Sequence, residues 1–497
     1  MLLSVFIGAV VFFATLFYYL KPRLTLAQAL RHLPCAPRLP ILGNIHLIPF
    51  DRTGFGRAMD ELYHQFSDDG LLALWLMHYP LVIIGRADAA EVILKSTTQI
   101  DKSDNYDFLE QWLGSGLLIS TGDKWRRRRK MLTPSFHFST LNAFVTVFNE
   151  KADILCNQLS ELADQQISFD SYPFISKCAL DIICQTAMGI NIHPQTQDTP
   201  YLRSVKRLTE ISLKYERSPW QWFKPIFYAS GVGFEYARNL KIVHDFTMKV
   251  ITDRQKEYAQ KHTGTKQGSE AKKRLAFLDL LLEMQDELTI DGIREEVDTF
   301  MFEGHDTTTS GMNWALFLLG HNPEIQEAVY DEIESVLGER KDFTADDLKE
   351  LKLLEACIKE ALRLYPPVPF YARRLSSPQQ INSYAMPTGA TVVIIPWLFH
   401  RDKANFGHNA NRFDPYRFLD ESQHRHPFSY VPFSAGLRNC IGQRFATMEE
   451  KTVIAKVVRQ FQIKSVERTL SVPPVPEIVT KPSSTILLKL TKRQKMK

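Results

Sequence analysis

The sequence predicts a mainly α-helical protein that also carries small β-sheets. Helical periodicity dominates from residue 87 to residue 363. Short strand candidates lie outside that stretch, at residues 71–77, 81–84, 391–395 and 485–490. No long linker rich in Pro, Gly or Ser divides the 497 residues. We therefore expect a single domain over residues 51–497, preceded by a separate N-terminal region.

Composition narrows the classes of function. Hydrophobic residues make up 44% of the chain and include 32 Phe, enough to fill a large core and to line an apolar pocket. The net charge is only +4, and no stripe of alternating basic and aromatic residues occurs, so a nucleic-acid partner is not expected. The six cysteines show neither a framework spacing nor a Cys-x-x-Cys pair. This distribution is typical of a reducing, cytosol-facing compartment.

Residues 1–20 are predicted to form an N-terminal transmembrane anchor. They carry no charged side chain, are about long enough to cross a bilayer as a helix, and are followed by Lys21, Pro22 and Arg23. Basic residues after the span predict that the rest of the chain faces the cytosol. A cleaved signal peptide is the main rival, although no basic region precedes the span and no small-x-small site precedes Lys21. A buried N-terminal helix is the other alternative.

Residues 21–50 are predicted to form a proline-rich linker. Pro34, Pro37 and Pro40 prevent a continuous helix here, because proline lacks the amide hydrogen that a helix needs. We expect this segment to be a stiff connection between the membrane and the body of the protein.

The next elements follow from local patterns. Residues 71–77 and 81–84, separated by His78, Tyr79 and Pro80, favour a β-hairpin. The polar run 261–274 contains two Gly and no apolar periodicity, which favours a surface loop. Residues 291–320 favour one long helix, and residues 351–364 favour another.

Cys440 lies in a frame that is typical of a haem-iron ligand. Phe433, Gly436, Arg438 and Gly442 surround it at fixed spacing, just before a helix-like run. Glycines allow close approach of the backbone to a flat macrocycle, amides near the helix start can donate to the sulfur, and Arg438 can pair with a propionate. The alternative is a small buried hydrophobic residue, the usual role of an isolated cysteine. The absence of Cys-x-x-Cys-His excludes a haem attached through thioether bonds.

At these residues the chain resembles the cytochrome P-450 family of haem-thiolate monooxygenases. The resemblance implies the cytochrome P-450 fold and a haem b (iron protoporphyrin IX) held by the Cys440 thiolate. It also implies that Trp125 and Arg129, four residues apart, bind a propionate with Arg373, for which Arg374 is the substitute candidate. The basic neighbours Arg126, Arg127, Arg128 and Lys130 would face outward to dock an electron donor, or form only a solvated face.

The predicted helix 291–320 carries the candidate oxygen-side residues. Phe300, Glu303, Gly304, Thr307 and Gly311 share one face at helical spacing, and the two glycines would let the helix lie against the haem. Thr307 would hold a hydrogen-bond network beside dioxygen, while Asp306 would supply protons from the solvent side. The alternative is that these polar residues only bond to the helix backbone.

Glu303 stands where most of the family has a small residue. A carboxylate that faces an apolar pocket must be protonated, paired or chemically consumed. In the fatty-acid ω-hydroxylase branch, family four, a glutamate at the matching position can form an ester with a haem methyl group. Glu303 resembles that residue, and we therefore expect an ester-linked haem in an insect-like, microsomal member of this branch.

Other motifs match the family in supporting roles. Glu360, Arg363 and Arg417 would form a buried network beneath the haem loop, although Tyr416 stands where the family more often has Glu. Val368 and Phe370 are candidate substrate contacts. The aromatic cluster around Pro219 and Pro225 matches the family's substrate-channel lid, which dips into the membrane, and a core patch is the alternative: Trp220, Trp222, Phe223, Ile226, Phe227 and Tyr228.

The expected function is therefore that of a membrane-bound monooxygenase. It would insert one oxygen atom from O2 into a C–H bond of a lipophilic substrate, with terminal hydroxylation of fatty acids or related lipids favoured. Electrons would come from NADPH through NADPH-cytochrome P-450 reductase, with cytochrome b5 as a further donor, at the endoplasmic reticulum membrane. The alternatives are oxidation of xenobiotics or hormone-like terpenoids, a haem-thiolate isomerase or dehydratase, and a non-catalytic membrane haem binder.

Overall fold

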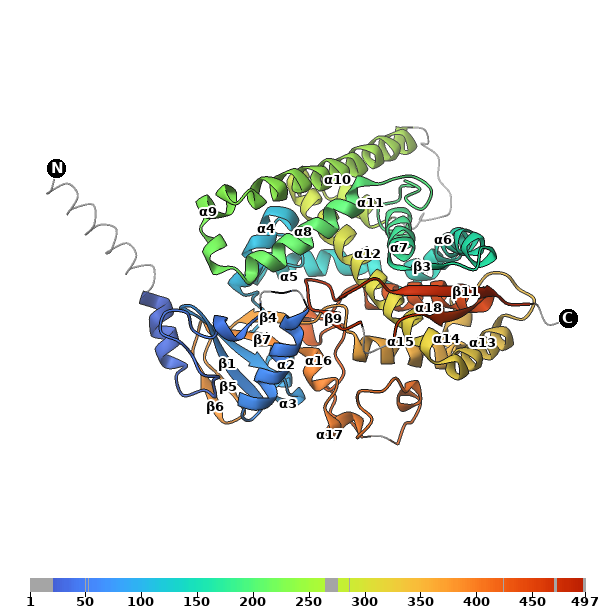
Figure 1. Cartoon of the computed structure of the whole chain (residues 1–497). Coiled ribbons are helices and arrows are strands. Elements are labelled where there is room, and N and C mark those ends of the chain that lie inside the picture. Colours follow the sequence, from blue (N-terminus) through green and yellow to red (C-terminus); the bar gives the residue numbers. More distant parts are fainter. Residues whose placement is uncertain are drawn as a thin grey trace.

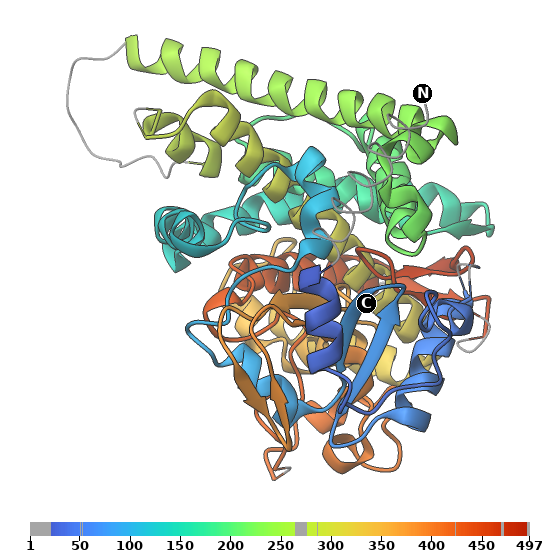
Figure 2. The same ribbon diagram turned by 90° about the vertical axis from the view of Figure 1, so that its left-hand side faces the viewer.

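The computed structural model describes residues 21–49, 51, 53–263, 276–285, 287–422, 424–468 and 472–494. Figure 1 shows a large helical region and a smaller region that contains the strands β1, β2, β4 and β7. Figure 2 shows the same division from the side, with the green helices above and the blue and orange strands below. The expected class, mainly α with small sheets, is confirmed.

The helices lie mostly in the middle of the chain and cover the ranges that follow. They are α2 Gly54–Phe66, α3 Ala87–Leu94, α4 Asp107–Leu113, α5 Gly122–Leu132, α6 Phe138–Asp164, α7 Tyr172–Thr186, α8 Pro200–Glu216, α9 Lys224–Ala229, α10 Val232–Thr263, α11 Phe277–Glu283, α12 Ile290–His321, α13 Pro323–Leu337, α14 Asp347–Glu350, α15 Lys352–Leu364, α16 Pro396–Phe399, α17 Lys403–Phe406 and α18 Gln443–Gln460. Short 3-10 turns are η1 Ile45–Leu47, η2 Asp104–Tyr106, η3 Thr133–Phe136, η4 Pro219–Trp222, η5 Pro415–Phe418 and η6 Gly436–Arg438.

The strands form small separate sheets. They are β1 Leu71–Leu76, β2 Tyr79–Ile84, β3 Ser168–Asp170, β4 Tyr371–Arg374, β5 Gln379–Ile381, β6 Tyr384–Met386, β7 Thr391–Ile394, β8 Phe461–Ser465, β9 Pro474–Val475, β10 Lys481–Pro482 and β11 Leu487–Lys492. The largest sheet has the order β1-β2-β7-β4, and β3-β11-β8 form a second sheet.

The predicted hairpin is confirmed as β1 and β2, but β2 begins earlier than expected. Tyr79 and Pro80 already belong to β2, and Pro80 lies opposite Trp75. A proline fits there because pairing of β2 with β7 begins only at Leu81, so the missing amide hydrogen costs no hydrogen bond to β7. The turn is tight, and Met77 has a positive φ of 57°.

Helix α12 is the central element of the helical region (Figure 1). The sequence prediction of one long helix over residues 291–320 is confirmed. The Thr289 side chain caps its start by accepting a hydrogen bond from the Gly292 amide at 3.1 Å. Most of its residues from Gly292 to Leu319 are buried, as expected for a helix that is surrounded by other elements. Helices α7, α15 and α18 and strand β8 pack around it.

The predicted anchor, residues 1–20, lies outside the described residues. Within the described part of the chain, no helix is both long and apolar enough to cross a membrane. Residues 30–44 pack against β1, where the Ala73 amide donates to the Pro34 carbonyl at 2.7 Å. The Asn44 side chain joins the same contact by accepting from the Trp75 amide at 2.8 Å.

The predicted loop 261–274 overlaps the end of α10. Helix α10 continues to Thr263, so residues 261–263 are helical and the loop expectation is wrong for them. The rest of that predicted loop lies outside the described residues.

Candidate functional site

The Cys440 loop is held by its own backbone and by the start of α18. The Cys440 amide donates to the Phe433 carbonyl at 2.9 Å, and the Gly442 amide donates to the Cys440 thiol. Burial and the nearby Glu303 charge raise the pKa of Cys440 to about 12, while the Gly442 amide and Arg129 oppose that rise. Ligation to a metal cation lowers the pKa of a thiol and would offset this rise.

Gly436 is required by the loop for a different reason from the one expected. Its φ is 68°, and a Cβ at this position would overlap the carbonyl oxygen of Leu94 at the end of α3. It does not line the cavity that Cys440 faces. The close approach that glycine permits is therefore an approach to α3, which fixes the loop's position, and not an approach to a macrocycle.

Cys440 faces an internal cavity of about 220 Å³. Residues from α12, α5, β4 and the cysteine loop line the cavity together. The expected site residues among its lining are Trp125, Arg129, Phe300, Glu303, Gly304, Thr307, Arg373, Phe433, Arg438, Cys440 and Gly442. Residues far apart in the sequence thus meet at one site, as the motif analysis anticipated.

Several cations converge on this cavity. Arg129 donates to the carbonyl of Asn439 at 2.8 Å, and Arg438 donates to the carbonyls of Ile100 and Ser120 while its guanidinium lies 4.5 Å from the Trp125 ring. Arg373 is buried and also lines the cavity, whereas Arg374 pairs with Asp104 on the exposed side of β4. Burial and the neighbouring Arg373 lower the pKa of Arg438 to about 9. Such a cluster of cations would be stabilised by an anionic ligand.

Lys102 belongs to the same group, and sequence reasoning missed it. It lines the cavity, and burial together with Arg373 and Arg438 holds its pKa well below the ordinary lysine value. Its ammonium lies 4.2 Å from the centre of the Tyr106 ring. A single lysine in an irregular segment carries no motif, so only the packing of that segment over the cavity reveals it.

Glu303 extends from α12 into the cavity and opposes these cations. Burial raises its pKa to about 7, Glu296 adds to the rise, and Lys102, Arg129 and Arg438 oppose it. Glu303 thus lies in a buried, largely apolar site, as expected, but three cations also act on it: Lys102, Arg129 and Arg438.

Thr307 and Asp306 point in different directions. Thr307 lines the cavity, and its hydroxyl donates to the Glu303 carbonyl at 2.7 Å. Asp306 is buried away from the cavity, where the Tyr172 hydroxyl donates to its Oδ1 at 3.1 Å and the Lys481 ammonium lies 3.6 Å from its Oδ2. The two residues are adjacent in sequence, but a helix turns consecutive side chains by about 100°.

The two glycines of α12 contact other elements. A Cβ on Gly304 would press on Ile183 of α7, and one on Gly311 would overlap the carboxyl of Glu450 on α18. Gly304 also lines the cavity, whereas Gly311 does not. Of the two glycines, only Gly304 is therefore placed to lie against a group bound in the cavity, because α18 packs against α12 at Gly311.

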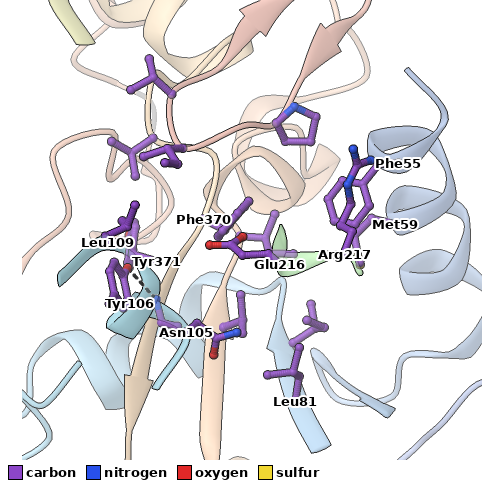
Figure 3. A pocket seen from close by; sticks show the side chains of 18 of the residues that line it. Phe55, Met59, Leu81, Asn105, Tyr106, Leu109, Glu216, Arg217, Phe370 and Tyr371 are labelled. Atoms are coloured by element: carbon purple, nitrogen blue, oxygen red, sulfur yellow. Dashed lines mark hydrogen bonds between the residues drawn. The ribbon is translucent and has the colours of Figure 1, made fainter. Parts of the chain in front are cut away.

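A second, mainly apolar cavity of about 220 Å³ adjoins the first (Figure 3). Val368 and Phe370, the expected substrate contacts, both line it. The two cavities share the lining residues Lys102, Leu118, Glu303, Thr307, Val368 and Tyr371. An apolar molecule in the second cavity would thus lie next to the residues that face Cys440.

Comparison with known proteins agrees with this arrangement. The family model described as cytochrome P-450 matches residues 33–490. The chain belongs to the cytochrome P-450 family. It is 44% identical over 478 residues to cytochrome P-450 4V2 of Mus musculus, covering 94% of this chain and 91% of that protein. Cytochrome P-450 4c3 of Drosophila melanogaster is 37% identical over 505 residues, or 98% and 94% of the two chains.

A further Drosophila melanogaster relative, probable cytochrome P-450 4s3, is 40% identical over 491 residues, covering 94% of this chain and 96% of that protein. These relatives all carry a family four designation, and the resemblance to that branch is confirmed. The protein is thus a P-450 monooxygenase. A haem with a cysteine thiolate ligand is the cofactor that the family implies, and the cavity fits it: one thiol lies at its wall, and Lys102, Arg129, Arg373 and Arg438 could neutralise acidic substituents.

A buried network of charged side chains joins α15 to η5 in this P-450. Arg363 donates to both carboxylate oxygens of Glu360, each at 2.7 Å, and Arg417 donates to Glu360 Oε1 at 3.0 Å. Both arginines also donate to backbone carbonyls, including His400 at 2.7 Å and Phe406 at 2.8 Å. The three charged side chains are buried, and their contacts join α15 to η5, as the sequence predicted.

One part of the basic run was assigned wrongly from the sequence. Arg126, Arg127 and Lys130 are exposed on α5, but Arg128 is buried. Arg128 donates to Glu296 at 2.7 Å and joins α5 to α12. Helical spacing alone did not reveal this, because the buried carboxylate that it meets comes from a distant element.

Proposed function

We propose that this P-450 hydroxylates fatty acids or related lipids near the terminal carbon. The observation that carries the proposal is the apolar cavity that shares Glu303 and Thr307 with the cavity of Cys440. An elongated apolar chain can be desolvated there while one end reaches the Cys440 cavity. The relatives' family four names support the same class of substrate.

The proposed cofactor is haem b, which Cys440 would hold through its thiolate. When bound, the haem supplies the oxygen-activating chemistry. Trp125, Arg129, Arg373 and Arg438 are proposed to bind the propionates, and we add Lys102 to this set. Phe433 and Gly436 would keep the loop in place, Phe433 by accepting from the Cys440 amide and Gly436 by its fit against α3.

Thr307 and Asp306 are proposed to serve proton delivery. Thr307 would orient a hydrogen-bonded proton donor at its hydroxyl oxygen, next to the cavity. Asp306 would take part from the opposite side of α12, where Tyr172 and Lys481 contact its carboxyl. Proton transfer between the two residues requires water or side-chain movement, because the Asp306 carboxyl and the Thr307 hydroxyl face different sides of α12.

Glu303 is proposed to form an ester with a haem methyl group during turnover. Its carboxylate oxygen would bond to the methyl carbon, which loses one proton and two electrons, and dioxygen reduced in the P-450 reaction would accept those electrons. Support comes from the position of Glu303 on the wall of both cavities. Denaturation in acidic organic solvent after turnover should leave haem on the wild-type protein and release it from Glu303→Ala. Complete release of unmodified haem from both proteins would contradict the ester.

We further propose that the protein acts at the endoplasmic reticulum membrane, with the catalytic domain facing the cytosol. The large exposed apolar side chains on η4, α9 and the start of α10 support contact with lipid: Trp220, Phe223, Ile226, Tyr228 and Phe234. The exposed basic residues Arg126, Arg127 and Lys130 suit an acidic electron donor, namely NADPH-cytochrome P-450 reductase or cytochrome b5.

Product analysis tests the proposed substrate class. The full-length holoenzyme, reductase and NADPH would be incubated with a mixed lipid extract, and the products would be identified by mass spectrometry. We expect fatty acids hydroxylated at or next to the terminal carbon. Turnover of terpenoids or xenobiotics in parallel incubations, with no fatty-acid product, would overturn the assignment of substrate.

A further inference from the structure

Glu216 places an acidic group in the apolar cavity. It is the last residue of α8, and Figure 3 shows its carboxyl among the labelled lining side chains, close to Phe370 in this view. Among the described residues, the lining has four with charged side chains: Lys102, Glu216, Arg217 and Glu303. Lys102 and Glu303 also line the Cys440 cavity, whereas Glu216 and Arg217 do not.

The carboxyl of Glu216 has no hydrogen-bond or ion-pair partner within the described part of the chain. Its neighbour Arg217 is directed elsewhere, since it donates to the Asp51 carbonyl at 3.2 Å and its guanidinium lies 5.5 Å from the Phe55 ring. Burial raises the pKa of Glu216 to about 7, and Arg217 opposes that rise. A polar group kept in apolar surroundings is stabilised when a ligand hydrogen-bonds to it.

We propose that Glu216 is a specificity-determining residue that hydrogen-bonds the oxygen-bearing end of the substrate, a hydroxyl or a carboxyl group. The proposal rests on the proposed function, because it assumes a chain whose other end reaches Thr307. In its protonated form Glu216 donates to a carboxylate, and in either form it accepts from a hydroxyl.

In this cavity, a hydrogen bond to Glu216 would determine the orientation of the bound chain. Apolar lining contributes affinity that depends on area and hardly on direction, so by itself it would let a lipid chain bind in either orientation. A polar group that lies away from the Thr307 end makes the two orientations unequal, because the reversed chain would leave the Glu216 carboxyl unpaired. Glu216 would thereby favour presentation of the hydrocarbon end to the reacting site.

The test compares three ligands that share one chain length: dodecane, dodecanol and dodecanoic acid. Dissociation constants would be measured on the full-length holoenzyme from the ligand-induced change in its haem spectrum. Glu216→Leu should weaken binding of the two oxygen-bearing ligands by roughly three- to tenfold, the range for loss of one hydrogen bond, and should leave dodecane binding unchanged or tighter. Glu216→Gln should retain most of the affinity for dodecanol.

Glu210→Gln is the matched control, because Glu210 lies on the same helix, pairs with Arg207 and does not line the cavity. A loss of affinity in Glu216→Leu that is confined to dodecanol or to dodecanoic acid would support the proposal and identify which group is recognised. An equal effect of Glu216→Leu on all three ligands, or no effect on any, would overturn it. If Glu216→Leu does not retain haem, Glu216→Ala removes the same carboxyl without added bulk and allows the same comparison.

The binding measurement is independent of the proposed reaction. Failure of every fatty acid to be hydroxylated, with the selective binding loss still present, would count against the proposed function and not against the role of Glu216. Where hydroxylation occurs, Glu216→Leu should also spread the products of dodecanoic acid over more chain positions than the wild type gives.

Discussion

At the residue scale, this P-450 is notable for titratable groups that are buried beside its cavities. Glu303 and Glu216 each have a pKa raised to about 7, mainly because burial disfavours the charged carboxylate. Around Glu303, the cations Lys102, Arg129 and Arg438 offset part of that cost. Groups with strongly shifted pKa values gather at functional sites, which fits the proposed roles of both residues.

The dependence of stability on pH tests the effect of burial on Asp298 of α12. Its side chain is buried, with His244 Nε2 at 3.7 Å and Arg294 Nη1 at 3.8 Å, and burial raises its pKa to about 8. An unfolded aspartate titrates near about pH 4, so between roughly pH 4 and pH 8 only the folded state keeps this proton. The contribution of protonated Asp298 to stability is therefore complete at low pH and is lost as the pH rises through that window.

Asp298→Asn should remove this pH dependence, because Asn is neutral at every pH. We expect the Tm of the variant holoenzyme to rise relative to the wild type as the pH increases from about 5 to about 8. Thermal unfolding followed by circular dichroism would measure the difference. A Tm difference that does not change with pH would show that Asp298 is ionised throughout in the folded protein.

At the scale of elements, separate segments are fixed to one another by a few close or charged contacts. Gly436 seats the cysteine loop against α3, and Glu360 joins α15 to η5. The Glu360 network was expected from the sequence motifs, whereas the contact of Gly436 with α3 was not. The contact between Gly436 and Leu94 depends on how two distant segments pack, which local spacing does not encode.

Gly436→Ala should displace the cysteine loop. The substitution adds about 1–2 kcal/mol of backbone strain at a positive φ and an overlap with the Leu94 carbonyl. Gly389→Ala is the control, since Gly389 has a φ of 84° but open space around its Cβ position. We expect a lower haem content, measured from the ratio of haem to protein absorbance, for Gly436→Ala only. Equal haem content in both variants would contradict the steric role.

Glu360→Ala should destabilise the protein far more than loss of a surface charge. It leaves Arg363 and Arg417 buried without their carboxylate, a change that typically costs about 3–5 kcal/mol. Asp198→Asn breaks an exposed pair with Arg203 and should cost less than about 1 kcal/mol. The Tm of each holoenzyme would be compared. Similar small losses in the two variants would indicate that the network is not a principal support.

At the scale of the whole molecule, the sequence allowed the fold class, the long helix α12 and many residues of the Cys440 cavity wall to be predicted. Those features depend on periodicity and on motif spacing within one segment. Three features were not predicted: the cavity positions of Lys102 and Glu216, and the burial of Arg128. Each depends on which distant element packs against the residue. The separation of Asp306 from the cavity was missed because its partners, Tyr172 and Lys481, come from far along the chain.

The central claim is that Cys440 and the two adjoining cavities form one oxygen-inserting site for a lipid chain. The most direct test is hydroxylation of dodecanoic acid by the full-length holoenzyme with reductase, NADPH and dioxygen labelled with heavy oxygen, followed by mass spectrometry. We predict one heavy oxygen atom in the product of the wild type and no product from Cys440→Ala. Full activity of Cys440→Ala, or product oxygen that comes from water, would contradict the claim.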